Sequence, residues 1–191
     1  MEGETDILNA DSRAMRYSAA AVVIHWLSAA LLIVQLWLGF TFSDLPKGPE
    51  RGDLFLWHKT LGVTILLLAL LRLAVRLMNP PPPFPRDFVG WQRGAAVWTH
   101  RFFYLLLIVI PLTGLAAVSS RGKPVALQFG LEVPPIPGIT KSLGEVVGEA
   151  HEILVFVTIA LLVVHVVAAL KHQFADRGPL ANRMWPFRAS G

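Results

Sequence analysis

Four long apolar segments constrain this chain more than any other feature of its sequence. They span roughly residues 19–42, 54–77, 97–118 and 151–170, and each can reach the length of a membrane span. A helix of about 20 residues crosses the roughly 30 Å of hydrocarbon in a bilayer. Only helices and closed barrels satisfy the backbone there, and continuous rather than alternating apolar runs favour helices. The sequence therefore predicts an all-α integral membrane protein, a four-helix bundle.

The composition agrees with this fold class. Of the 191 residues, 54% are hydrophobic and only 16% are charged, whereas soluble domains carry about 25% charged residues. The chain has no cysteine, which excludes disulfides, cysteine-ligated zinc, iron–sulfur clusters and covalently attached c-type haem. The net charge of +4 does not indicate nucleic-acid binding, because most basic residues lie between the apolar segments and set topology.

The distribution of lysine and arginine predicts the topology. The N-terminal tail, the second connection with its adjoining helix ends, and the C-terminal tail hold 11 of the 17 basic residues. The first and third connections, counted in the same way, hold the other 6. The positive-inside rule then places both termini in the cytoplasm. We expect a cytoplasmic tail at 1–16, a transmembrane domain at 17–186 and a second cytoplasmic tail at 187–191.

The connections between the segments differ in character. The connection at 43–53 is short and polar, and the connection at 79–85 holds five prolines, so we expect an extended polyproline segment at the membrane surface. The stretch 119–149 is the longest connection and contains glycine and proline throughout. Loops of this length are uncommon and often functional. Pro111, within the third segment, is expected to kink that helix.

The six histidines are the most informative residues, and all lie in or at the ends of the apolar segments: His25, His58, His100, His151, His165 and His172. A histidine within a membrane span is costly unless it has a partner, so each is a candidate site residue. For any single histidine, an interfacial or inter-helix hydrogen-bonding role is the alternative. His151, His165 and His172 are separated by 14 and 7 residues, which keeps them on one side of a helix.

Depth in the membrane pairs four of these histidines. His58 and His151 both lie near the outer face, whereas His25 and His165 both lie toward the inner face. Two histidines that face each other inside an apolar bundle are the usual means of holding a b-type haem by both axial positions. Two such haems, one above the other, would form an electron path across the bilayer.

Two other classes of site compete with haem. Zinc, copper or iron could be bound by His58 and His151 together with Glu149 or Glu152, although this leaves the inner pair unexplained. A proton-coupled transporter would use histidine and arginine as relays, although four helices without an inverted repeat do not favour it.

Short motifs along the chain carry a family resemblance: IHWL at 24–27, HKTLG at 58–62, PLTG at 111–114, RGKP at 121–124 and AALKH at 168–172. In this order, from about residue 17 to 186, the chain resembles the bacterial cytochrome b561 family. These are four-helix dihaem membrane cytochromes related to the cytochrome subunits of nickel hydrogenases and formate dehydrogenases. The resemblance implies a bacterial inner membrane and two non-covalent haem b groups. One haem would be ligated by His25 and His165, and the other by His58 and His151.

The resemblance also implies a function in electron transport. Some members resemble superoxide oxidases, which take an electron from superoxide and reduce ubiquinone. We therefore expect a dihaem cytochrome that exchanges electrons with the quinone pool, acting as a superoxide:ubiquinone oxidoreductase. The alternative is an electron-transfer or anchor subunit that serves a separate periplasmic or membrane redox protein. Membrane lipid and quinone are the partners common to both.

The remaining candidates have structural alternatives. Four cations near the inner ends of the helices are candidates to pair with haem propionates, or are topological anchors: Arg72, Arg76, Arg101 and Lys171. His100 and His172 are candidates to bind a quinone at the inner boundary and deliver its protons, or to fill an interfacial structural role. Gly39 and Gly62 either leave room for the macrocycles or allow close helix packing.

Overall fold

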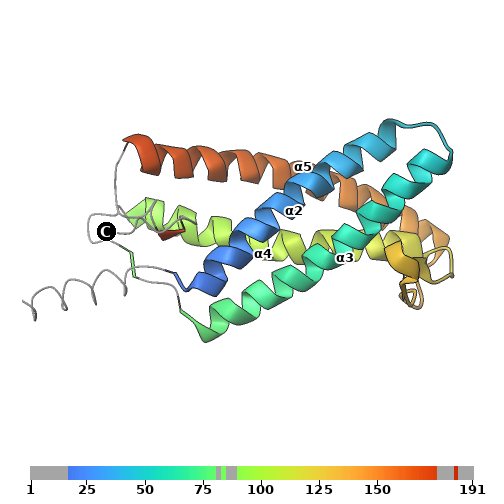
Figure 1. Cartoon of the computed structure of the whole chain (residues 1–191), viewed down its shortest axis with the longest axis horizontal. Helices are drawn as coiled ribbons and strands as arrows, with labels where there is room; N and C mark the ends of the chain where they lie inside the picture. The colour runs from blue at the N-terminus through green and yellow to red at the C-terminus, as the bar shows by residue number, and fades with distance from the viewer. Residues whose placement is uncertain (1–16, 81–82, 85–89, 176–182, 185–191) are drawn as a thin grey trace, which may run out of the picture.

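Four long helices dominate the computed structural model, which describes residues 17–80, 83–84, 90–175 and 183–184. They are α2 (Ala19–Asp44), α3 (Pro49–Met78), α4 (Gly90–Ser119) and α5 (Lys141–Leu170) (Figure 1). A π-helical turn, η2 (Lys171–Ala175), continues α5. Within the described residues, each of the four is long and apolar enough to cross a membrane. The expectation of an all-α membrane four-helix bundle is confirmed, and the chain is a multi-pass membrane protein.

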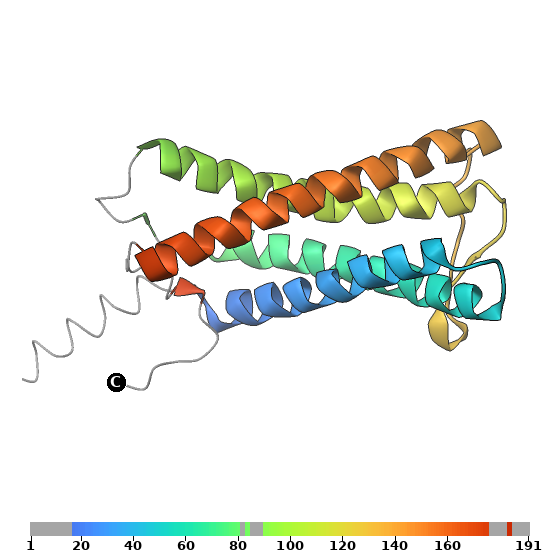
Figure 2. The ribbon, with the colours of Figure 1, turned by 90° about the horizontal axis from the view of Figure 1, so that it is seen from above.

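The helices alternate in direction along the bundle. In both views the start of α2 and the end of α5 lie at one end, which we call the termini end (Figures 1 and 2). The opposite end, which we call the hairpin end, holds the α2–α3 connection and the short strands between α4 and α5. The helix α2 packs on α3, α4 packs on α5, and α3 packs on α4. The two sequential hairpins therefore meet chiefly through α3 and α4.

The connection between α4 and α5 forms a small structured cap. Strands β1 (Val125–Ala126) and β2 (Glu132–Val133) pair antiparallel around the 3₁₀ turn η1 (Gln128–Gly130). The Gln128 backbone N–H donates to Thr60 Oγ1 of α3 at 2.9 Å, which fixes the cap to the bundle. Within the cap, the side chains of Val125 and Leu127 are buried. The cap is therefore fixed to α3 at a residue only two positions after His58.

Several helices begin earlier than the apolar segments that predicted them. The helix α3 begins at Pro49, where the missing proline N–H costs nothing. The helix α5 begins at Lys141, after the Thr140 side chain accepts a hydrogen bond from the Leu143 N–H. The loop expected over 119–149 therefore ends at Thr140, and the prediction was wrong for the last nine residues. Hydropathy detects only the part of a helix that lies in hydrocarbon, and polar turns extend beyond it.

Few side chains are fully buried inside the bundle, and many large apolar side chains lie on its exterior. Ile65 and Ala69 of α3 pack with Leu107 of α4 in the buried core. In contrast, Ile33 and Leu67 expose 63% and 61% of their surface. A soluble protein seldom exposes so much contiguous apolar surface. These side chains therefore face lipid, in agreement with the membrane assignment.

The termini end is tied together by two long-range hydrogen bonds. Trp26 Nε1 donates to the Met184 carbonyl at 2.7 Å, and Arg183 Nη1 donates to the Pro83 carbonyl at 2.8 Å. The expected N-terminal tail at 1–16, the tail at 187–191 and prolines 81, 82 and 85 lie outside the described residues. The extended form expected for the proline segment therefore stays a prediction.

Candidate functional site

Two histidines from different helices face each other near the hairpin end. His58 lies on α3 and His151 on α5, and their ring centres are 6.3 Å apart with the planes at 76°. Both side chains are half-buried in the bundle. This is the outer pair that depth along the helices predicted, and the structure brings it together.

A backbone carbonyl of α4 fixes the orientation of His151. Its Nδ1 lies 2.9 Å from the Ile110 carbonyl oxygen, with Thr113 Oγ1 at 3.4 Å. A carbonyl only accepts, so Nδ1 carries the hydrogen and Nε2 of the neutral ring keeps its lone pair. Histidines that bind metal almost always donate their other ring N–H to a carbonyl, carboxylate or water. His151 is therefore oriented as a metal ligand would be.

The polar partner of His58 is a glutamine of α2. Gln35 Nε2 lies 3.3 Å from His58 Nε2 and 3.0 Å from the His58 carbonyl oxygen. Two buried atoms of this pair, His58 Nδ1 and Gln35 Oε1, have no hydrogen-bond partner among the described residues. Buried polar atoms are rarely left unpaired in native proteins. The described residues thus leave two hydrogen-bonding atoms of this site without a partner.

Two glycines allow the imidazoles to approach neighbouring helices closely. A Cβ on Gly39 of α2 would lie 3.2 Å from His58 Cε1, and a Cβ on Gly114 of α4 would lie 3.0 Å from His151 Cε1. A Cβ on Gly62 would meet Gln35 Nε2 at 3.3 Å. Gly39 therefore leaves room for the His58 ring and Gly62 for the Gln35 amide, and the choice between macrocycle space and close helix packing stays a prediction. Gly114 was quoted only as part of a motif, and its contact with His151 was not foreseen.

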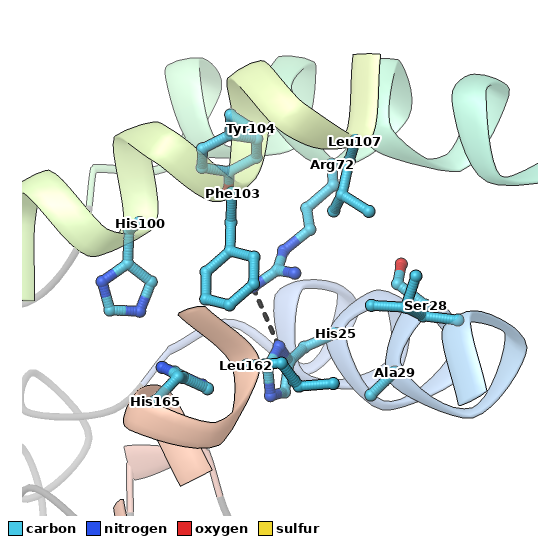
Figure 3. Close-up of a pocket in the computed structure, with 11 residues that line it drawn as sticks. His25, Ser28, Ala29, Arg72, His100, Phe103, Tyr104, Leu107, Leu162 and His165 are labelled. Atoms are coloured by element: carbon cyan, nitrogen blue, oxygen red, sulfur yellow. Dashed lines mark hydrogen bonds between the residues drawn. The ribbon is translucent and has the colours of Figure 1, made fainter. Parts of the chain in front are cut away.

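The second histidine pair lies in a pocket nearer the termini end (Figure 3). His25 of α2 and His165 of α5 have their ring centres 6.4 Å apart, at 72°. Phe103 of α4 packs on the His165 ring at 5.3 Å between centres. His165 follows His151 by 14 residues, which is about 21 Å along a helix. One helix, α5, thus contributes to both pairs at two depths.

A third imidazole enters the same pocket. His100 of α4 lies 5.6 Å from His165 between ring centres, and its Nδ1 donates to the Ala96 carbonyl at 2.6 Å. The sequence predicted a quinone-binding role for His100 together with His172, at the inner boundary. In the structure His100 lines the pocket of His25 and His165, while His172 is half-buried in η2.

One arginine also lines this pocket. Arg72 Nη2 donates to His25 Nδ1 at 2.9 Å, and the guanidinium lies over the Tyr104 ring, 5.6 Å from its centre. Figure 3 shows the Arg72 side chain reaching from α3 toward His25. An arginine only donates, so His25 Nδ1 is the acceptor in this arrangement, and the hydrogen of the neutral ring lies on Nε2. To hold a metal through Nε2, His25 would carry that hydrogen on Nδ1 instead, and the Arg72 guanidinium would remain a neighbouring charge without this hydrogen bond.

The other three cations considered for propionates do not line the pocket. Arg76 is half-buried one turn beyond Arg72, and Lys171 is exposed at the start of η2. The Arg101 side chain is also exposed, with its guanidinium 5.0 Å from the centre of the Trp98 ring. Of the four, Arg72 lines the pocket and contacts a histidine of the pair.

Facing imidazoles at two depths of an apolar helical bundle define the class of membrane-embedded b-type cytochromes. The comparison with known families is in agreement: residues 16–187 match the model of prokaryotic cytochrome b561, and the chain belongs to this family. The chain is 29% identical over 177 residues to cytochrome b561 homolog 2 of Escherichia coli strain K12, covering 88% of this chain and 90% of that protein. It is 27% identical over 171 residues to the probable superoxide oxidase CybB of Yersinia pestis, covering 90% and 96%.

The residues present fit the b-type haem that this family implies. A metal–imidazole bond is about 2 Å long, so two imidazoles on opposite sides of one metal stand about 6 Å apart between ring centres. The separations of 6.3 and 6.4 Å agree with this spacing. The Nδ1 of His151, bonded to a carbonyl, is a further sign of a metal ligand. The orphaned Nδ1 of His58 shows that the protein alone does not satisfy the hydrogen-bonding groups of this site.

The competing zinc-type site receives no support. Within the described part of the chain, no group of three or more His, Asp or Glu side chains converges as a metal site. Glu149 and Glu152, the carboxylates considered for it, are exposed on α5. The other alternative, a proton-coupled transporter, receives no support either, because the chain belongs to a cytochrome family.

Proposed function

We propose that the protein is a dihaem cytochrome that carries electrons across the bacterial inner membrane to or from the quinone pool. His25 and His165 would hold one haem, and His58 and His151 the other. The observation that carries this proposal is the presence of two facing imidazole pairs with nearly equal ring separations. Bound there, haem supplies one-electron chemistry, and two imidazoles per iron favour electron transfer over oxygen binding.

The chain's own residues would orient the ligands and exclude water. Ile110 and Thr113 hold the His151 ring, and Gln35 holds His58. Phe40 of α2 and Phe156 of α5 pack edge to face, 6.1 Å between ring centres, and supply apolar contact between these two helices. A fixed ligand set in apolar surroundings limits the rearrangement that accompanies the gain or loss of an electron.

The proposed reaction is oxidation of superoxide at the hairpin end and reduction of a quinone at the termini end. The named activity of the Yersinia relative supports superoxide as the donor. Lys47, Arg121 and Lys123 are exposed at the hairpin end and would attract an anion. At the termini end, His100 and His172 are the proposed groups for quinone binding and proton delivery. In this topology both chain termini lie in the cytoplasm.

A second candidate function is electron transfer to or from a partner protein at the hairpin end. Phe129 of η1 exposes 80% of its surface and adopts φ 62°, a conformation that bulky residues rarely adopt. Its ring lies 5.8 Å from that of the exposed Trp57. Exposed aromatic side chains beside cations are typical of protein interfaces. The exposed surface around Phe129 and Trp57 therefore supports a docked protein as the alternative electron-transfer partner.

One experiment distinguishes the two candidates. The purified, haem-loaded protein is mixed rapidly with superoxide, and haem reduction is followed by absorbance, with superoxide dismutase added as the control. Added ubiquinone should then reoxidise the haem. Reduction within the mixing time, abolished by the dismutase, supports the superoxide oxidase. Haem that superoxide leaves oxidised, but that a chemical reductant reduces, would reject it in favour of the partner-dependent carrier.

A further inference from the structure

The two histidine pairs differ in the charge of the groups that touch them. At the hairpin end the contacts are neutral, because the Gln35 amide meets His58 and the Ile110 carbonyl accepts from His151. At the termini end a guanidinium meets the pair, with Arg72 Nη2 2.9 Å from His25 Nδ1. The structure thus contains a fixed electrostatic difference between the two sites.

The charge of Arg72 is permanent and poorly screened. Arginine stays protonated in proteins, and Arg72 is half-buried in the membrane-spanning helix α3. The described residues that line this pocket include no aspartate or glutamate that would neutralise it. A charge in such low-dielectric surroundings acts far more strongly than one in water.

We infer that Arg72 gives the His25–His165 site the higher reduction potential and so directs electrons toward the termini end. This inference rests on the proposed dihaem function. Gaining one electron lowers the charge of a site by one unit, so a nearby cation stabilises the reduced state. A single electron would then leave the His58–His151 site, which is oxidised, and come to rest at the His25–His165 site, which is reduced.

Hydrogen bonding at the hairpin end acts in the same direction. The Ile110 carbonyl accepts from the His151 Nδ1–H and makes that imidazole a stronger electron donor. A more basic ligand favours the oxidised metal, which lowers the potential of that site. Pairing of Arg72 with a carboxylate of the cofactor would not reverse the difference in reduction potential between the two sites. Both cofactors carry the same carboxylates, so the charge of Arg72 remains the difference.

The cation closest in sequence to the other pair does not offset this difference. Lys59 follows His58 on α3, but its Nζ lies over the Phe55 ring, 5.0 Å from the ring centre. Phe55 is one turn nearer the start of α3, and so nearer the surface of the hairpin end. Water and salt screen a charge there much more than within the bundle.

The test is a redox titration of the haem-loaded, full-length protein, followed by absorbance. The two potentials are assigned with His151→Ala, which retains the His25–His165 site. We expect the surviving potential to be the higher one. In Arg72→Gln, the equilibrium constant for electron transfer to the termini end should fall tenfold or more, equivalent to 59 mV for one electron. Arg72→Lys keeps the charge and should stay within threefold of the wild type.

Arg101→Gln is the matched control, because it removes the same charge at the same end of the bundle from an exposed side chain. It should change the equilibrium constant less than twofold. The inference is overturned if Arg72→Gln shifts the constant no more than Arg101→Gln does. It is also overturned if the potential surviving in His151→Ala is the lower one, and this outcome decides the matter even if Arg72→Gln fails to bind haem. A wild-type protein with fewer than two haems would instead contradict the proposed function.

Discussion

The substitution Gly114→Ala provides the sharpest test of how the bundle positions a haem ligand. The added Cβ would lie 3.0 Å from His151 Cε1 and 3.1 Å from Nδ1. Carbon atoms in good contact are about 3.5–4.0 Å apart, so the ring must retreat by a few tenths of an ångström. This movement weakens the 2.9 Å hydrogen bond from His151 Nδ1 to the Ile110 carbonyl.

Two energetic costs set the loss of haem-binding free energy expected for Gly114→Ala. Complete loss of that hydrogen bond would cost about 1 kcal/mol, and holding the side chain away from its preferred rotamer would cost about another 1 kcal/mol. Together these costs of about 2 kcal/mol set the upper limit of the effect, about 30-fold weaker haem binding at the hairpin end. The substitution should not reduce the stability of α4 itself, because alanine is a better helix former than glycine by about 1 kcal/mol.

The assay is haem content per chain after purification at limiting haem, with low-spin spectra to report ligand geometry. Gly94→Ala is the matched control, because a Cβ at this position of the same helix would meet nothing within 4 Å. We expect Gly94→Ala to retain wild-type haem content and Gly114→Ala to lose mainly one haem. If Gly114→Ala binds both haems with wild-type affinity and an unchanged spectrum, the proposed role of the glycine is wrong.

Three further predictions concern ligands, quinone and topology. His58→Ala should remove the hairpin-end haem and spare most of the other, which haem quantification after gel filtration checks; equal loss of both in a well-folded variant would contradict the pairing. His100→Gln and His172→Gln should each slow quinone-dependent reoxidation of pre-reduced haem by about 10²-fold if the histidine acts as general acid, and wild-type rates with full haem content in both would reject that quinone site. A reporter that fluoresces only in the cytoplasm should be bright when fused to the C-terminus, and a dark fusion with an active periplasmic reporter would reverse the topology.

Much of the fold and of the pairing of the histidines could be predicted because both follow from periodicity and depth. The apolar segments predicted the four helices, and counting residues along them placed His58 level with His151 and His25 level with His165. A separation of 14 residues returns to nearly the same side of α5 in any regular helix. These relations do not depend on how the helices rotate against one another.

The partners of the histidines depend on that rotation, and the sequence did not reveal them. The Ile110 carbonyl is a backbone atom with no signature of its own, and Gln35 is a single polar residue within an apolar segment. His100 was expected with His172, whereas the rotation of α4 turns it toward His165. The one available signal was the PLTG motif at 111–114, which follows Ile110 and contains both Thr113 and Gly114.

The haem content of the purified protein tests the central claim most directly. Haem b is extracted with acid acetone, quantified as its pyridine complex and divided by the amount of chain, for the wild type and for His151→Ala. We predict two haems per wild-type chain, both fully extractable because the chain has no cysteine to attach them, and one haem per chain in the variant. A wild-type protein that binds one haem or none after growth in haem excess would contradict the account.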